Sequence, residues 1–265
     1  MLSPKSIAIP VITAFLIIFS NNCIADDIAS AGRSIFNNHQ EAVVRVSLII
    51  KFRLFMNGNE KKKSESKTET TGTILTPAGL TLISLNTTEP DKMAEENIKR
   101  KTGSQMRLES ELGDIIIILS DGKEIPGTIV LRDRDLDLAF IRPAKENELS
   151  FHSLWTVKKG TPEVMDLVFS LGRLPKLGSR AATISMDRIH AIVTKPRTVY
   201  IPFFTRELGA PIFAENGSWI GNMLLRYNPS GDTNPPAMFV ILPADDIMEI
   251  AAQAPKIETP ANELK

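Results

Sequence analysis

Histidine and cysteine, which supply many of the bases, nucleophiles and metal ligands of enzymes, are scarce in this chain of 265 residues. The three histidines, His39, His152 and His190, lie far apart, and no two have the helical or turn spacing of a zinc site. The single cysteine is Cys23. Phosphate-loop and dinucleotide-binding motifs are also absent. We therefore expect neither a metal nor a cofactor.

The charged residues balance, with 31 Lys and Arg against 31 Asp and Glu and a pI near 6.9. A neutral chain has no broad positive field to gather phosphates, so we expect no nucleic-acid partner. Hydrophobic residues make up 43% of the sequence, which is ordinary for a globular protein. The length suits one or two domains.

The N-terminal residues resemble an export signal in their order. Lys5 precedes an apolar run of 13 residues, 7–19, which is shorter than the roughly 20 residues that span a bilayer. Small side chains at Cys23 and Ala25 suit cleavage just before Asp26. We predict that residues 1–25 are a signal peptide, that the protein is periplasmic or secreted, and that the mature chain has no cysteine. Retention of this segment as a membrane anchor is the alternative, and only then would the protein contact a membrane.

The rest of the chain predicts an all-β fold between two short helices. Residues 26–40 carry a loose helical pattern, and a helix is also expected after Pro243. Runs rich in Val, Ile and Leu, separated by turn residues, predict strands and paired antiparallel β-barrels. These runs are 43–55, 72–75, 80–85, 114–120, 125–131, 136–141, 164–171, 181–193, 197–204, 210–214, 219–226 and 236–242.

The remaining polar stretches predict loops. We expect residues 57–71 to be a solvated flexible loop, because lysine, serine, glutamate and threonine dominate there without aromatics. Residues 90–113 predict a polar insertion, and residues 254–265 a polar tail. Trp155 and Trp219 are expected in or near the core.

Four segments in order resemble the trypsin-like serine proteases of the HtrA/DegP type. They are 72–87, which begins Gly72-Thr73-Ile74 and ends Asn86-Thr87; 121–139, with Asp121-Gly122 and Asp137-Leu138-Ala139; 209–221, with Gly209-Ala210-Pro211, Asn216-Gly217 and Ile220-Gly221; and 239–245, Phe239 to Asp245. The resemblance covers about 41–253. It implies a chymotrypsin-like double antiparallel β-barrel over 41–253, with short N-terminal and C-terminal helices.

The same resemblance implies a catalytic triad that is incomplete. The histidine position is Asn86, the aspartate position is Asp137 and the nucleophile position is Leu208. Hydrolysis by this route needs a hydroxyl that attacks, an imidazole that takes its proton and a carboxylate that orients the imidazole. Leucine has no nucleophilic atom, and the asparagine amide is not basic near neutral pH.

The oxyanion hole is altered as well. In the family, backbone N–H groups of the nucleophile and of a glycine two residues earlier form it, and these positions are Leu208 and Arg206 here. A Cβ at a position that demands a glycine conformation would turn the peptide away from the hole. The upstream substrate wall is apolar, with Tyr200, Phe203 and Phe204. These aromatics either fill the former substrate cleft or line a groove that holds a peptide without cutting it.

We therefore expect a non-catalytic homologue of these proteases that serves as a protein- or peptide-binding or structural module. Asp137 is either a relict catalytic carboxylate or, as we favour, a strand-end acid that accepts hydrogen bonds from the backbone or from Asn86. Ser84 and Ser218 do not repeat the family geometry. The alternative is an active serine-type peptidase whose catalytic residues lie outside these matched positions.

Overall fold

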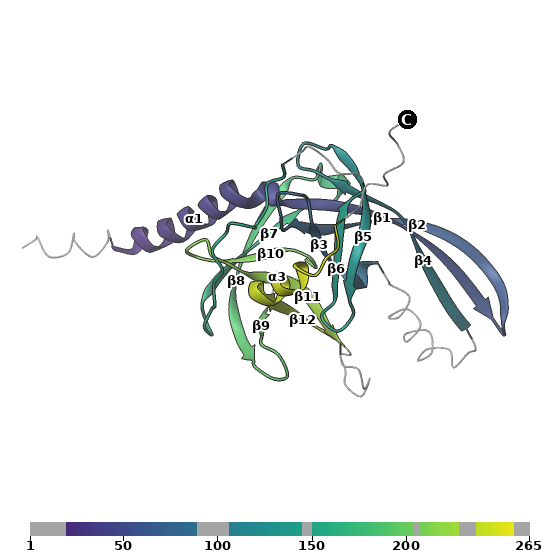
Figure 1. Cartoon of the computed structure of the whole chain (residues 1–265). Helices are drawn as coiled ribbons and strands as arrows, with labels where there is room; N and C mark the ends of the chain where they lie inside the picture. The colour runs from purple at the N-terminus through teal and green to yellow at the C-terminus, as the bar shows by residue number, and fades with distance from the viewer. Residues whose placement is uncertain (1–19, 89–105, 145–149, 204–206, 228–236, 257–265) are drawn as a thin grey trace, which may run out of the picture.

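The structure, a computed structural model, describes residues 20–88, 106–144, 150–203, 207–227 and 237–256. Within them, two closed antiparallel barrels of six strands each lie side by side (Figure 1). The strand order is β1-β2-β3-β6-β5-β4 in the first barrel and β10-β11-β12-β9-β8-β7 in the second. The predicted chymotrypsin-like double barrel is confirmed.

The chain completes the first barrel before it begins the second. The first contains β1 (Val43–Met56), β2 (Asn59–Ile74), β3 (Thr81–Ser84), β4 (Met106–Ile118), β5 (Glu124–Asp133) and β6 (Leu138–Pro143). The second contains β7 (Leu167–Arg173), β8 (Ala182–Val193), β9 (Val199–Pro202), β10 (Pro211–Ala214), β11 (Trp219–Tyr227) and β12 (Ala237–Pro243). Short 3-10 turns are η1 (Gln40–Ala42), η2 (Leu85–Thr87) and η3 (Lys176–Gly178).

Three clusters of buried apolar residues hold the barrels. Alternate residues of β1, such as Val46 and Leu48, pack with Ile117 in the cluster of the first barrel, as expected for strands with one face buried. Ile212 and Met223 belong to the cluster of the second barrel. The third and largest cluster joins both barrels and both helices; its members include Ile35, Phe140, Leu171, Phe213, Trp219 and Ile247.

Among the residues that the structure describes, two helices flank the barrels. α1 (Ser20–His39) lies against β7 and β8 and extends beyond them (Figure 1). α3 (Ala244–Ala251) follows Pro243 and carries Asp245 and Asp246 in its first turn, where acidic residues suit the helix dipole. In the part of the chain that the structure describes, no helix is both long enough and apolar enough to span a membrane.

The expected flexible loop at 57–71 is wrong, because residues from Asn59 onward form β2. This strand pairs with β1 from Met56↔Asn59 to Val43↔Thr73. The polar composition of this segment gave the wrong prediction because β1 supplies the apolar side chains of the strand pair. Pairing with a neighbouring strand decides whether a segment forms a strand more than its intrinsic preference does. On the other side of β1, β4 begins at Met106, within the expected polar insertion.

The outer parts of these three strands project from the first barrel as an arm (Figure 1). We define the arm as residues 51–67 of β1 and β2 and residues 106–112 of β4. The strand order in it is β2-β1-β4.

The two tryptophans differ. Trp219 is buried as expected, but Trp155 is 56% exposed, so its expected place in the core is wrong. The preceding residue, Leu154, takes the core position: it is buried, and its N–H donates to the carbonyl of Ile74 at 3.1 Å. Trp155 is consequently directed outward from the turn.

Candidate functional site

Asp137 lies in the turn between β5 and β6 and is almost completely buried. Its Oδ1 accepts the backbone N–H of Asn86 at 2.8 Å. Its Oδ2 accepts the hydroxyl of Ser84 at 2.6 Å and the backbone N–H of Leu225 at 2.9 Å. Ser84 and Asn86 belong to the first barrel and Leu225 to the second, so the carboxylate links the two barrels.

The environment of Asp137 raises its pKa to about 6. Burial is the largest cause, since it disfavours the charged carboxylate. The hydrogen bonds from Ser84, Leu225 and Asn86 oppose the rise because they favour the charged form. The group therefore gains its proton more readily in the folded protein than in an unfolded chain.

Leu208 lies in the short loop before β10, and its side chain packs against the cluster inside the second barrel. The next residue, Gly209, has φ +83 and donates its N–H to the carbonyl of Met223 at 2.8 Å. Its own carbonyl accepts Thr73 Oγ1 at 2.7 Å and Asn222 Nδ2 at 2.8 Å. The loop is thus fixed to both barrels, and the side chain at the nucleophile position makes an apolar contact.

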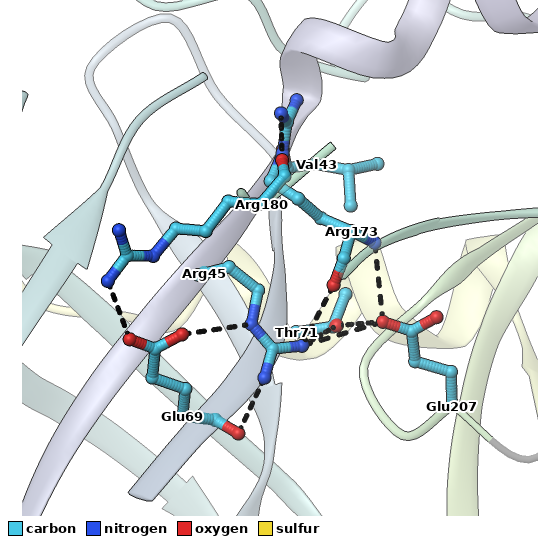
Figure 2. A network of polar contacts seen from close by, with 7 residues as sticks. All are labelled: Val43, Arg45, Glu69, Thr71, Arg173, Arg180 and Glu207. Atoms are coloured by element: carbon cyan, nitrogen blue, oxygen red, sulfur yellow. Dashed lines mark hydrogen bonds and ion pairs between the residues drawn. The ribbon is translucent and has the colours of Figure 1, made fainter. Parts of the chain in front are cut away.

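Glu207, the residue before Leu208, turns its carboxylate toward the first barrel (Figure 2). The hydroxyl of Thr71 donates to Glu207 Oε1, and the backbone N–H of Arg173 donates to the same oxygen at 3.3 Å. Arg45 Nη1 lies 3.6 Å from it. Glu207 is therefore an anchor between the loop and the interface of the barrels.

Arg45 is the centre of this interface network (Figure 2). Its Nη1 donates to Thr71 Oγ1 at 2.8 Å and to the carbonyl of Arg173 at 3.1 Å, and its Nη2 donates to the carbonyl of Glu69 at 2.7 Å. The side chain is only 9% exposed. Burial lowers the pKa of Arg45, and the carboxylates of Glu207 and Glu69 oppose this effect.

Two further arginines extend the network. Arg173 donates to three backbone carbonyls: from Nε to Val43 at 2.8 Å, from Nη1 to Arg180 at 3.0 Å and from Nη2 to Gln40 at 2.9 Å. Arg180 Nη2 donates to Glu69 Oε1 at 2.7 Å. Burial pushes the pKa of Glu69 upward, but its contacts with the arginines outweigh burial and hold that pKa below its usual value. Such a buried network requires its partners to be present together.

This network was not predicted from the sequence. A signal was present at Arg45, which interrupts the apolar run between Val44 and Val46 in a predicted strand. A charged residue in such a place requires buried partners. Its partner Glu69 lies on the adjacent strand β2, which was expected to be a loop, and its partner Glu207 comes from the second barrel.

The three aromatic candidates do not form one surface among the described residues. Tyr200 is 4% exposed and belongs to the cluster inside the second barrel. Phe203 is 60% exposed and stacks on His190, with ring centroids 5.3 Å apart. Phe204 lies outside the described residues, as does Arg206 of the oxyanion-hole position.

The remaining nucleophile and base candidates have ordinary partners. The ring of His39 stacks on Phe213 at a centroid distance of 4.8 Å, and burial lowers the pKa of His39. The hydroxyl of Ser218 donates to Asn216 Oδ1 at 2.7 Å. Across the described ranges, no group of three or more His, Cys, Asp or Glu residues has an arrangement that could hold a metal ion.

Comparison with known proteins supports the fold. No protein-family model matches this chain, and no curated protein matches its sequence. A solved structure of an HtrA-type protease, an AlgW variant with a decapeptide, aligns with a TM-score of 0.53 and 14% sequence identity, over 83% of this chain and 65% of that chain. Another, an AlgW variant with a tripeptide, aligns with a TM-score of 0.49 and 15% identity, over 83% and 62%.

The two barrels therefore have the architecture of the trypsin-like, HtrA-type proteases. The chain spans slightly less than two thirds of the length of these solved structures.

Proposed function

We propose that this protein is an exported, non-catalytic homologue of the HtrA-type serine proteases that acts as a protein- or peptide-binding or structural module. The observation that carries the proposal is the loop at Glu207, Leu208 and Gly209. Its central side chain is aliphatic and packs against a barrel, and the preceding carboxylate is engaged with Arg45 and Thr71. A leucine in this place can neither attack a carbonyl carbon nor be activated by a base.

The surroundings of Asp137 support the same proposal. In a working triad the carboxylate orients an imidazole. The residue at the histidine position is Asn86, whose backbone N–H binds Asp137. Two further donors, from Ser84 and Leu225, bind the other oxygen. This carboxylate is bound as a structural link between barrels.

Peptide binding, unlike hydrolysis, does not require a nucleophile. The HtrA-type structure that aligns with a TM-score of 0.53 contains a decapeptide, and we extend peptide binding to this chain as a proposal. The signal peptide expected from the sequence supports the proposal that the protein is periplasmic or secreted.

A fluorophosphonate probe tests the absence of catalysis. The purified protein should show no covalent labelling under conditions in which an active trypsin-like protease is labelled fully. Labelling that heat denaturation abolishes would overturn the proposal and favour an active peptidase with other catalytic residues.

A second test restores the missing groups. The double variant Asn86→His, Leu208→Ser should remain at least 100-fold less active on a fluorogenic protein substrate than an active HtrA-type protease. The reason is that Arg206 replaces the glycine of the oxyanion hole and Glu207 anchors the loop to the interface; loss of oxyanion donors alone costs about 100-fold or more. Activity close to that of the protease would contradict this account.

A further inference from the structure

The outer edge of β2 in the arm has no neighbouring strand among the described residues. β2 pairs with β1 along its length, but with β3 only at Thr73 and Ile74. Every residue from Asn59 to Lys67 is exposed. Alternate residues of such an edge direct their N–H and C=O groups outward, so the edge can accept a further strand.

This edge is positively charged. Residues 59–67 contain four lysines, Lys61, Lys62, Lys63 and Lys67, and two glutamates, Glu60 and Glu65. Lys63 lies 3.4 Å from Glu60. The other three lysines form no ion pair within the described parts of the chain. An incoming strand therefore meets a net positive edge.

The charges are ordered across the arm. On one face, Lys63 lies opposite Arg53, which in turn lies opposite Glu109 on β4. Glu109 is already engaged, with Arg53 at 3.5 Å and with Arg107 at 2.7 Å. Lys63 thus has a like charge on its inner side and an open outer side. An acidic residue facing it from an added strand would relieve this repulsion.

The strand register shows which other residues of β2 favour an acidic residue opposite them. Side chains two residues apart share a face, so Lys63, Glu65 and Lys67 lie on one face of β2, and Lys62, Ser64 and Ser66 lie on the other. The favoured partner has acidic residues opposite Lys63 and Lys67 and a polar or basic residue between them. It also has an acidic residue opposite Lys62 and hydroxyl-bearing or small residues opposite the serines.

We propose that the β2 edge of the arm binds an extended acidic segment of a partner protein by strand addition. The inference rests on the proposed binding function and names its surface and ligand class. Backbone hydrogen bonds supply the pairing, and the lysines select acidic partners. A second copy of this chain is a poorer occupant, because in the β4 edge that it would offer Glu109 is engaged in its own arm and Arg107 adds a positive charge, which leaves Glu111 as the remaining acid.

The test uses the full chain and a synthetic nine-residue peptide that follows this pattern, with glutamate opposite Lys62, Lys63 and Lys67, lysine opposite Glu65 and threonine elsewhere, capped at both ends and fluorescently labelled. A peptide with lysine in place of glutamate is the ligand control. The triple variant Lys61→Glu, Lys62→Glu, Lys63→Glu removes the positive edge. Its matched control reverses three exposed lysines outside the arm, Lys123→Glu, Lys176→Glu and Lys256→Glu, with the same change in net charge.

We expect anisotropy to show binding of the acidic peptide, at least tenfold weaker binding to the edge variant and little change with the control variant. Hydrogen exchange should slow at the amides of 59–67 when the peptide binds. Equal weakening by both variants, or unchanged exchange at 59–67, would overturn strand addition. Self-association of the chain alone that the edge variant abolishes would assign the edge to a second copy and also overturn the proposal. Fluorophosphonate labelling does not involve the arm, so a failure here is separable from a failure of the proposed lack of catalysis.

Discussion

The carboxylate of Asp137 is bound from two barrels at once, yet its position is unfavourable for a charge. Three donors hold it, and burial still raises its pKa to about 6. In an unfolded chain an aspartate titrates near pH 3.9. The folded state therefore binds the proton more tightly than the unfolded state, and the stabilisation from this group is complete below about pH 3.9 and lost as the pH rises through 6.

This difference predicts a pH effect on stability. Relative to Asp137→Asn, which cannot titrate, the wild-type protein should gain about 1 kcal/mol of unfolding free energy when the pH falls from 7.5 to 5. Urea unfolding of both proteins at the two pH values measures the change. Other titrating groups, including Glu69, are common to both proteins and cancel. Parallel pH profiles for the two proteins would contradict the raised pKa.

The residues of the site were predictable only in part. A bond between Asp137 and Asn86 follows from the matched segments, since they place both residues at strand ends of one barrel. The inward turn of Glu207 does not follow, because its partners Arg45 and Thr71 come from β1 and β2 of the other barrel. Contacts between barrels depend on docking geometry, which a strand pattern does not encode.

The loop before β10 depends on a glycine that no other residue replaces easily. A Cβ on Gly209 would collide with the backbone carbonyl of Thr71, and its φ of +83 is left-handed. Gly217 has nearly the same φ, +82, but open space around it.

These two glycines form a matched pair. Gly209→Ala should lower the unfolding free energy by about 3 kcal/mol, from strain and from the collision, and Gly217→Ala by about 1 kcal/mol, from strain alone. Thermal and urea unfolding measure both. Equal decreases in unfolding free energy would contradict this expectation, because they would show that the loop shifts away from Thr71 of β2 and avoids the collision.

Arg45 and Arg53 lie on the same strand, β1, and allow a buried and an exposed arginine to be compared. Arg45→Met should cost about 3 kcal/mol, because Glu207 and Glu69 lose a nearby positive charge and the carbonyls of Arg173 and Glu69 lose their donor. Arg53→Met on the exposed arm should cost less than about 0.5 kcal/mol, as is usual for exposed ion pairs. Urea unfolding at low and high salt checks both values. A small decrease in unfolding free energy for Arg45→Met would show that the network contributes little to stability.

The same strand shows why elements were predicted unevenly. β1 alternates or runs apolar through Val44, Val46 and Leu48, so its pattern predicts a strand directly. β2 is polar from Asn59 to Thr71 and becomes a strand because β1 lies beside it. An apolar sequence pattern indicates which side chains of a segment are buried, and β2 has few buried side chains outside the barrel.

The whole molecule was predicted better than its parts. Short apolar runs with turns between them already indicated paired barrels, because closure removes the edges of an antiparallel sheet. The arm departs from that plan, because the pairing of β2 and β4 with β1 continues beyond the closed barrel. In the arm, the outer edges of β2 and β4 have no neighbouring strand among the described residues.

The N-terminus provides a prediction at this scale. Secreted or periplasmic protein should have Asp26 as its first residue, measured by intact-mass and N-terminal peptide analysis. α1 spans Ser20–His39 and has no acid in its first turn. Cleavage after Ala25 would place Asp26 and Asp27 at the new helix start, where negative charge is favourable. A mature chain that retains residues 1–25 would instead support an anchor.

The division of the interface network between barrels also bears on how the chain folds as it is synthesised. Each barrel closes within its own stretch of sequence, and β1 to β6 end at Pro143, before β7 begins at Leu167. Until the second barrel is synthesised, Arg45 and Glu69 have each other and Thr71 as partners but lack their contacts with Arg173, Arg180 and Glu207. The side of the first barrel that later contacts the second barrel therefore carries charged groups, and we expect these charges to keep it hydrated in the nascent chain. Synthesis of Arg173, Arg180 and Glu207 then completes the network between the barrels.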